Sequence, residues 1–94
     1  MSKYDPKPGD PVCVEQPQPD GSYAMYLGEL VGIDLEWIVL DRVTWVYQTG
    51  RRHLFFAGDA DSTTQWEVQQ GEQLLPRWGC RISRWQHALP TESK

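Results

Sequence analysis

Hydrophobic and polar residues follow a two-residue period along much of the first half of the chain, as in β-strands that bury one face. This period predicts strands over residues 11–16, 23–34, 42–48 and 51–56. A continuous apolar run over 36–41 predicts a further strand that is covered on both faces. Turn-forming residues separate these segments, so the pattern predicts a five-stranded antiparallel meander with short connections.

Gly28 lies in the middle of the long strand predicted over 23–34. A glycine inside a strand marks a β-bulge or a bend, and strands must bend for a small sheet to close on itself. We therefore expect an all-β fold in the form of a small antiparallel β-barrel. Large side chains fill the interior of such a barrel. Those expected to do so here include Trp37, Trp45, Trp66 and Trp78.

Beyond residue 57 the alternation is weaker. Residues 57–64 have the composition of a loop, and 65–69 that of a short strand. The sequence favours no more helix than a short turn over 71–75. Residues 78–84 alternate again, which predicts an extra C-terminal strand after the meander.

A chain of 94 residues allows one modest domain with a single hydrophobic core. We expect this β-barrel domain to span residues 12–88. The Pro-rich segment 1–11 is expected to be a disordered arm, and residues 89–94 a disordered tail.

Cys13 and Cys80 are the two cysteines of the chain, and they lack the close spacing of a zinc or redox site. We expect two reduced thiols that behave as small core residues. The N-terminal residues lack the apolar core of a signal peptide, and no segment approaches the roughly 20 apolar residues of a membrane span. A soluble cytoplasmic protein is therefore expected.

The net charge of −4 is unevenly distributed. Residues 1–41 carry a charge of −6, whereas residues 42–94 carry +2. The lysines lie near the ends of the chain, and the interior bases are Arg42, Arg51, Arg52, Arg77, Arg81 and Arg84. A guanidinium group binds carboxylate or phosphate through a planar fork and also stacks on aromatic rings. The arginines therefore either pair with surface acids or form a site for an anion.

The segment QTGRRHLFF, residues 48–56, gathers two arginines and a histidine. If 51–56 is a strand, Arg51 and His53 share its outer face, while Leu54 and Phe56 face the core. We assign the anion contact to Arg51 and His53, with Arg52 at the mouth of the barrel as the second choice. Aromatic side chains stack on nucleotide bases. The further residues expected at the ligand are Tyr47, Arg42, Arg81, Arg84 and Trp85.

The residue pattern does not indicate catalysis. The histidines, cysteines and acids show no spacing typical of a nucleophile with its base or of a metal site. No Gly-rich phosphate loop precedes a predicted helix. We therefore expect a protein that is not an enzyme and that needs no cofactor or metal.

Residues 28–40, GELVGIDLEWIVL, resemble the first Sm motif, in which a glycine, alternating apolar residues, an aspartate and a terminal leucine form a bent strand and its turn. Gly28, Leu30, Asp34 and Leu40 match this motif. The resemblance implies an Sm-like barrel and an RNA-binding module. The usual N-terminal helix and the second Sm motif have no recognisable counterpart here, so no RNA-contacting residue is carried over.

Residues 26–90 are similar to short uncharacterised proteins of bacteriophages and prophages, through the segments VLDRVTWVYQTGRRHLF and ISRWQHALP. Leu40, Arg42, Trp45 and Tyr47 are the matching positions. This resemblance implies an accessory protein that works in the host bacterial cytoplasm. Many such proteins counter host defence, either by blocking a defence protein or by sequestering its nucleotide signal.

These features predict a phage-type, non-enzymatic binding protein that sequesters an anionic, nucleotide-like immune signal. A ligand with few phosphates needs few arginines, whereas RNA affinity depends on neutralising several phosphates. Two alternatives stay open: inhibition of a host defence protein by the acidic half acting as a decoy, and an Sm-like RNA-binding module. We also expect a homo-oligomer, because one small barrel has little concave surface and a pocket forms most simply between subunits.

Overall fold

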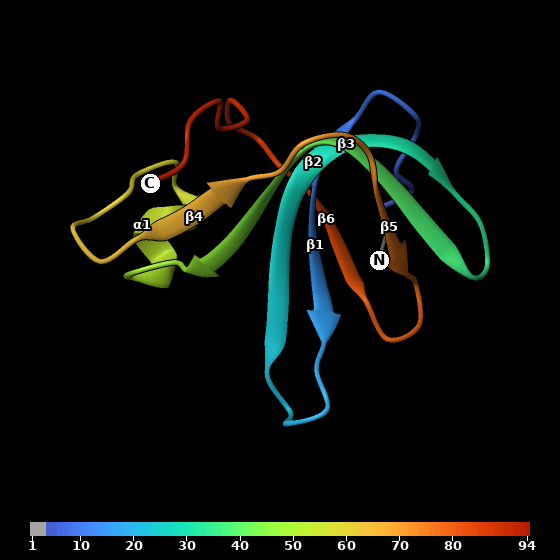
Figure 1. Cartoon of the computed structure of the whole chain (residues 1–94), viewed down its shortest axis with the longest axis horizontal. Coiled ribbons are helices and arrows are strands. Elements are labelled where there is room, and N and C mark those ends of the chain that lie inside the picture. The colour runs from blue at the N-terminus through green and yellow to red at the C-terminus, as the bar shows by residue number, and fades with distance from the viewer. Residues whose placement is uncertain (1–3) are drawn as a thin grey trace.

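A computed structural model describes residues 4–94, which form six β-strands and one short α-helix (Figure 1). In chain order the elements are β1 (Pro11–Pro17), β2 (Tyr23–Ile33), β3 (Trp37–Gln48), α1 (Arg52–Phe56), β4 (Gln65–Val68), β5 (Gln73–Pro76) and β6 (Arg81–Arg84). All strand pairs are antiparallel. The all-β prediction is thus confirmed. In the described part of the chain, no helix is long and apolar enough to cross a membrane.

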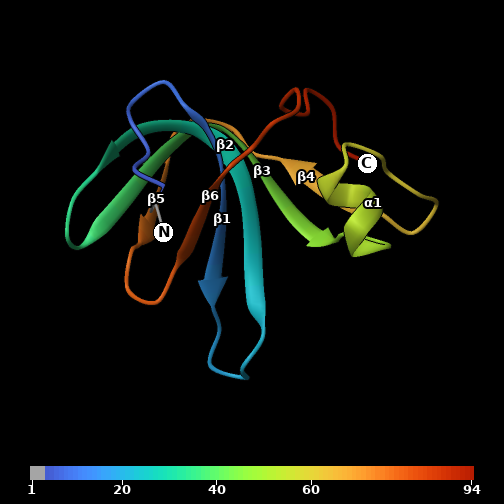
Figure 2. The ribbon, with the colours of Figure 1, turned by 180° about the vertical axis from the view of Figure 1, so that it is seen from behind.

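The sheet is open and does not form the predicted closed barrel. The strand order is β4-β3-β2-β1-β6, so that within residues 4–94 no pairing joins β4 to β6. The sequence predicts two strands over 36–41 and 42–48, but these residues form the single 12-residue strand β3. One half of β3 pairs with β5 and the other half with β4. In Figures 1 and 2, β2 and β3 arch over the molecule, with α1 and β4 on one side and β5 on the other.

The bend in β2 lies at Gly28, as the sequence predicts. The pairing of β2 with β3 shifts register between Leu27 and Glu29, as in a β-bulge. On β3, close to this shift, Arg42 has a left-handed backbone conformation with φ of 52°. A Cβ at Gly28 would lie 3.1 Å from the carbonyl oxygen of Asp41. Glycine therefore permits the close approach of β2 and β3 at the bend.

Buried side chains of the described residues form two clusters, where the sequence predicts a single core. The first core contains Val12, Val14, Leu30, Ile38, Leu40, Val43 and Leu75. The second core contains Cys13, Met25, Leu27, Val46, Phe55 and Trp85. Successive residues of β1 point to opposite faces of the sheet, so this strand contributes to both cores.

Several tryptophans do not occupy the predicted positions. Trp78 is 85% exposed, and Trp37 and Trp45 are 40% and 37% exposed, although all three were expected in the core. Trp45 alternates with the buried Val46 along β3 and so points away from the second core. Trp85, one of the residues predicted at the ligand, is buried in the second core.

Two local predictions are wrong. The sequence predicts a strand over 51–56, but Arg52–Phe56 form α1. Gly50, with φ of 69°, turns the chain out of the sheet. Phe55 then packs against Trp85, with a ring-centroid distance of 5.2 Å. The sequence also favours a helical turn over 71–75, whereas Gln73–Pro76 pair with β3 as β5. In both cases contacts with distant residues override the local pattern.

Both ends of the described chain make hydrogen bonds, in contrast to the predicted disordered arm and tail. The N–H of Gly9 donates to the carbonyl of Leu30 at 2.8 Å, and the N–H of Leu30 donates to the carbonyl of Asp10 at 2.9 Å. Trp66 of β4 and Lys94 exchange two backbone hydrogen bonds of 2.9 Å. Lys94 of the tail thus lies beside β4, and Gly9 and Asp10 of the arm lie beside β2. Residues 1–3 of the predicted arm lie outside the described residues.

Candidate functional site

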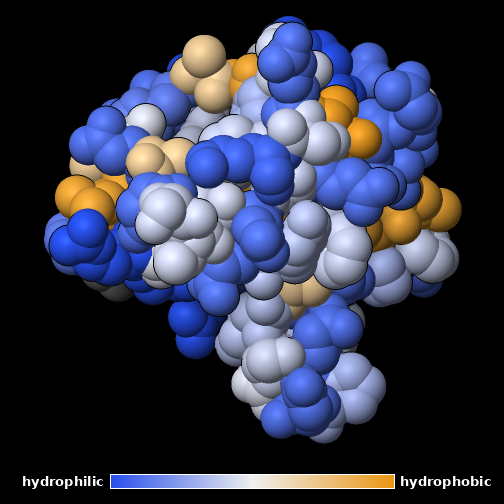
Figure 3. Space-filling view, turned by 60° about the vertical axis from the view of Figure 1, so that its left-hand side comes forward, coloured by the Kyte–Doolittle hydropathy of each residue, from blue (hydrophilic) through white to orange (hydrophobic). Residues whose placement is uncertain are grey.

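Strands β2 and β3 separate at one end of the sheet. Met25 and Val46 are paired, but beyond them Tyr23 pairs with β1 and Gln48 pairs with β4. The β1–β2 hairpin therefore projects from the body of the protein, as the ribbon and the space-filling view both show (Figures 1 and 3). The diverging strands leave a hollow between the hairpin and the end of β3.

This hollow is a groove of about 480 Å³, which we call the arginine groove. The residues that give it its chemistry are Glu15, Tyr23, Tyr47, Gln48, Arg52 and Arg81. Its volume lies in the range of roughly 300–1,000 Å³ that is usual for small-molecule sites. Three of the predicted ligand-binding residues, Tyr47, Arg52 and Arg81, are brought together here.

Arg81 is stacked on an aromatic ring at the wall of the groove. Its guanidinium carbon lies 4.8 Å from the centroid of the Tyr23 ring. The pairing of β6 with β1 sets Arg81 opposite Glu15 and so carries the guanidinium to the groove. No ion pair to Arg81 is present among the described residues. A cation–π contact orients the guanidinium while its N–H groups stay available for an anion.

Arg52 is the second cation of the groove. Its Nη2 donates to Oε2 of Glu15 at 2.9 Å, and its guanidinium lies 4.8 Å from the centroid of the Phe56 ring. The Arg52 side chain is 57% exposed, so solvent screens this ion pair. Because Glu15 offsets one of the two arginines, the groove keeps a single net positive charge.

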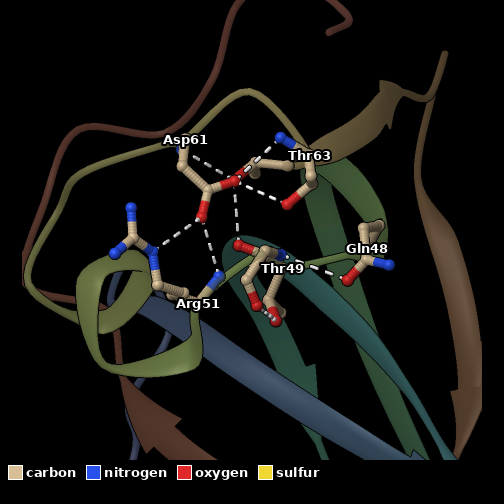
Figure 4. Close-up of polar contacts among 7 residues, drawn as sticks. Gln48, Thr49, Arg51, Asp61 and Thr63 are labelled. Atoms are coloured by element: carbon tan, nitrogen blue, oxygen red, sulfur yellow. Dashed lines mark hydrogen bonds and ion pairs between the residues drawn. The ribbon is translucent and has the colours of Figure 1, made fainter.

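Arg51, the first-choice anion contact, lies in a different set of interactions (Figure 4). Its N–H donates to Oδ2 of Asp61 at 2.9 Å, and its Nε lies 3.6 Å from the same oxygen. Oδ1 of Asp61 accepts the hydroxyl of Thr63 at 2.6 Å and the N–H of Thr63 at 2.8 Å. The Thr63 hydroxyl, followed by the Arg51 N–H, holds the pKa of Asp61 well below its usual range. Arg51 therefore fastens the loop at 57–64 to the start of α1.

Arg42 and Arg84 also form ion pairs away from the arginine groove. Arg42 Nη1 lies 3.2 Å from Glu29, and Arg84 Nη1 lies 3.7 Å from Asp10. Surface pairing with acids, the alternative that the sequence left open, is thus found for Arg42, Arg51 and Arg84 as well as for Arg52. The side chains of Arg42, Arg51 and Arg84 do not line the arginine groove, so the structure does not bring these three predicted contacts together with Tyr47, Arg52 and Arg81.

His53 and Trp85 are likewise outside the groove. His53 is exposed on α1, and the buried residue of that helix is Phe55 rather than the predicted pair of Leu54 and Phe56. The helix directs Phe55 into the second core with the half-buried Phe56 beside it, whereas a strand would present alternate residues.

Tyr23 and Glu15 complete the groove, although the sequence did not single them out. Tyr23 is 42% exposed, because it lies where β2 has already left β3. The local feature that could have indicated Tyr23 is its position directly after the Asp-Gly-Ser turn at 20–22, where a strand begins. Nothing local indicates that Arg81 reaches it, since that contact depends on the pairing of β6 with β1.

The two cysteines are free and lie outside the groove. Burial raises the pKa of the Cys13 thiol to about 12, and burial also raises the pKa of Cys80. Both thiols are therefore protonated at neutral pH, and a thiol in this form is a weak nucleophile and a weak metal ligand.

Comparisons of the chain with family models, with curated proteins and with solved structures find no match.

Proposed function

We propose that the protein binds a small anionic ligand of the nucleotide type in the arginine groove and does not transform it. The observation that carries this proposal is the position of Arg81, a cation stacked on Tyr23 at the wall of a groove of about 480 Å³. A phosphate in the groove accepts hydrogen bonds from the guanidinium groups of Arg81 and Arg52. Gln48 and Thr49 line the same groove and offer further hydrogen-bonding groups.

The charge of the groove favours a ligand with few phosphates. Arg52 and Arg81 face a single acid, Glu15, so the excess of positive charge is small. Non-specific affinity for RNA comes from neutralising several phosphates along the strand. A discrete nucleotide needs only the two guanidinium groups, which suits a chain with a net charge of −4.

In this proposal the ligand is a nucleotide-like immune signal, and the protein withholds it from a host effector. The resemblance of residues 26–90 to phage and prophage proteins supports this role, and with it a site of action in the host bacterial cytoplasm. If a purified host effector binds the protein and no nucleotide does, the function to infer is direct inhibition of a defence protein by the acidic half of the chain.

An Sm-like RNA-binding module is the second candidate function. The observation that favours it is the bulge at Gly28, which lies at the glycine of the first Sm motif and bends β2. Aromatic side chains beside the groove offer stacking surfaces for RNA bases as well as for a mononucleotide. Tighter binding of a short single-stranded RNA than of any mononucleotide would favour this candidate.

We also propose that the protein forms a homo-oligomer through the end of the sheet where β3 pairs with β5. Leu35, Leu74 and Trp78, which we call the apolar end, are 92%, 56% and 85% exposed. Leu74 lies opposite Val39 in the β3–β5 pairing, and the Leu35 turn is joined to residue 77 by a backbone hydrogen bond from Arg77 to Glu36. Exposed apolar groups that cluster in this way mark protein interfaces.

Charge at the apolar end suits a second copy of this chain as the partner. Arg77 Nη1 donates to the carbonyl of Asp34 at 2.6 Å, so the cation lies beside the turn that carries Asp34 and Glu36. A twofold axis through this end would bring the same surface of both copies together, with a cation and acids on each.

Equilibrium dialysis of the purified protein tests the proposed ligand class. The probes are inorganic pyrophosphate, nucleoside diphosphates and a short single-stranded RNA. We expect saturable binding of the phosphate-containing small molecules, weaker binding of the RNA, and recovery of the bound nucleotide intact when the protein is heated. Recovery of a cleaved product contradicts the non-enzymatic function, and the lack of any bound phosphate compound contradicts the proposal as a whole.

A further inference from the structure

A second hollow adjoins the arginine groove on the other side of the diverging strands. Its volume is about 490 Å³, and Tyr23, Val46 and Tyr47 line both hollows. Its other walls come from the β1–β2 hairpin and from Trp45 of β3. We call it the aromatic hollow. A ligand anchored by Arg81 therefore has a second, adjoining space to occupy.

Trp45 and Tyr47 form the aromatic wall of this hollow. They are two residues apart on β3, so their side chains share one face of the strand. Their ring centroids lie 5.0 Å apart, with an interplanar angle of 46°, and the residues are 37% and 51% exposed. Exposed aromatic faces of this kind stack on planar nucleotide bases.

The hairpin places a fixed carboxylate at the same hollow. Oδ1 of Asp20 accepts the N–H of Ser22 at 2.9 Å and the hydroxyl of Ser22 at 2.6 Å. These bonds, the hydroxyl first, lower the pKa of Asp20, so the group is ionised and acts only as an acceptor at neutral pH. Both bonds reach Oδ1, and Oδ2 has no hydrogen bond among the described residues.

We infer that the aromatic hollow takes the guanine base of a guanine nucleotide whose phosphates lie in the arginine groove. Guanine carries two adjacent N–H donors, the ring N1–H and the exocyclic amine, and both can donate to Oδ2 of Asp20. Adenine carries a ring acceptor next to its amine, and this acceptor would face the lone pairs of the carboxylate. The inference rests on the proposed function for its phosphate contact and adds the identity of the base.

Calorimetric titration of the full chain with guanosine diphosphate, adenosine diphosphate and inorganic pyrophosphate tests this inference. Guanosine diphosphate is expected to bind about tenfold more tightly than adenosine diphosphate, the scale of one hydrogen bond to a charged group. Trp45→Ala is expected to weaken the binding of guanosine diphosphate about tenfold, because stacking on the base is lost, and to leave the affinity for pyrophosphate unchanged. Asp20→Asn, which keeps an oxygen for Ser22, is expected to abolish the preference for guanine.

The outcomes distinguish a failure of the guanine assignment from a failure of the proposed anion site. Equal affinities for the two diphosphates, with pyrophosphate still bound, overturn the guanine assignment and leave the anion site in place. A guanine preference that persists in Asp20→Asn overturns the role of that carboxylate. The failure of all three probes to bind overturns the proposed function, and the guanine inference with it.

Discussion

The backbone N–H of Arg51 donates to the carboxylate of Asp61 at 2.9 Å, which ties the residue before α1 to the loop that follows the helix. The same carboxylate accepts the N–H and the hydroxyl of Thr63. A Cβ at Gly50 would clash with Asp61, so the close approach also depends on a glycine at the end of the preceding turn. The Asp61 carboxylate is thus one of the groups that hold the loop, together with the Thr64 hydroxyl, which donates to the carbonyl of Thr49 at 2.9 Å.

Acid is expected to weaken this loop and, with it, the fold. In the folded protein the pKa of Asp61 lies below its ordinary value of 3.8, which applies to the unfolded chain. The unfolded chain therefore binds protons first as the pH falls, so the stability that Asp61 contributes is present above about pH 4 and is lost below it. The side chain of the Asp61→Asn variant cannot ionise, so the free energy of unfolding of this variant should fall less steeply than that of the parent as the pH is lowered. Urea unfolding at several pH values measures this slope, and equal slopes in the two proteins would refute the role of the charge.

Gly28→Ala is expected to destabilise the protein by about 1–3 kcal/mol, the usual effect of overpacking. The added Cβ would lie 3.1 Å from the Asp41 carbonyl oxygen and 3.3 Å from Leu40 Cβ. Gly32→Ala is the matched control, because a Cβ there meets no atom within 4 Å. Its stability should stay within about 0.5 kcal/mol of the parent. Similar losses in both variants, measured by urea unfolding, would show that the close contact at the bulge is not responsible.

Trp85→Ala is expected to cost about 3–5 kcal/mol, because it opens a cavity in the second core. Trp85 is 6% exposed and packs against Phe55. Trp45→Ala, at a residue that is 37% exposed, should cost about 1 kcal/mol or less. Thermal unfolding followed by circular dichroism compares the two. A smaller loss for Trp85 than for Trp45 would contradict the placement of the second core.

The all-β fold could be predicted because the strands that bury one face show it in their alternation. β4 alternates in this way, and β1 and β2 read as strands although each contributes buried side chains to both cores. The bulge at Gly28 could be predicted from a glycine inside a strand. The helix α1 could not, since a five-residue segment is too short to show a helical period. Its conformation is set by Asp61, in the loop that follows it, and by Trp85, which lies far from it in sequence.

The candidate site could be predicted only in part, for a similar reason. The combination of arginine with aromatic residues indicated Tyr47, Arg52 and Arg81, which do meet in one groove. Whether an arginine is free or paired depends on acids that only the fold brings near. Glu15, for example, lies 37 residues from Arg52 in sequence. Arg51 lies outside this groove and pairs with Asp61, which belongs to a loop that local patterns do not describe.

The apolar end is expected to drive self-association. Light scattering coupled to size exclusion should give a mass that is a multiple of 10.9 kDa. Trp78→Ser should shift the protein toward the monomer, because an exposed tryptophan at an interface contributes strongly to binding. Gln86→Ser, at an exposed residue outside the apolar end, is the control and should leave the mass unchanged. A monomer at all concentrations would contradict the proposed homo-oligomer.

The affinity of Arg81→Ala for pyrophosphate tests the central claim most directly. Arg81 is the cation stacked on Tyr23 in the groove, and Arg84 on the same strand pairs with Asp10 outside it. Calorimetry should show a loss of roughly 1.5–3 kcal/mol for Arg81→Ala, the scale of a hydrogen bond to a charged group, and no change for Arg84→Ala. Equal affinities in the parent and Arg81→Ala, or an equal loss in both variants, would contradict the assignment of the arginine groove as the anion site.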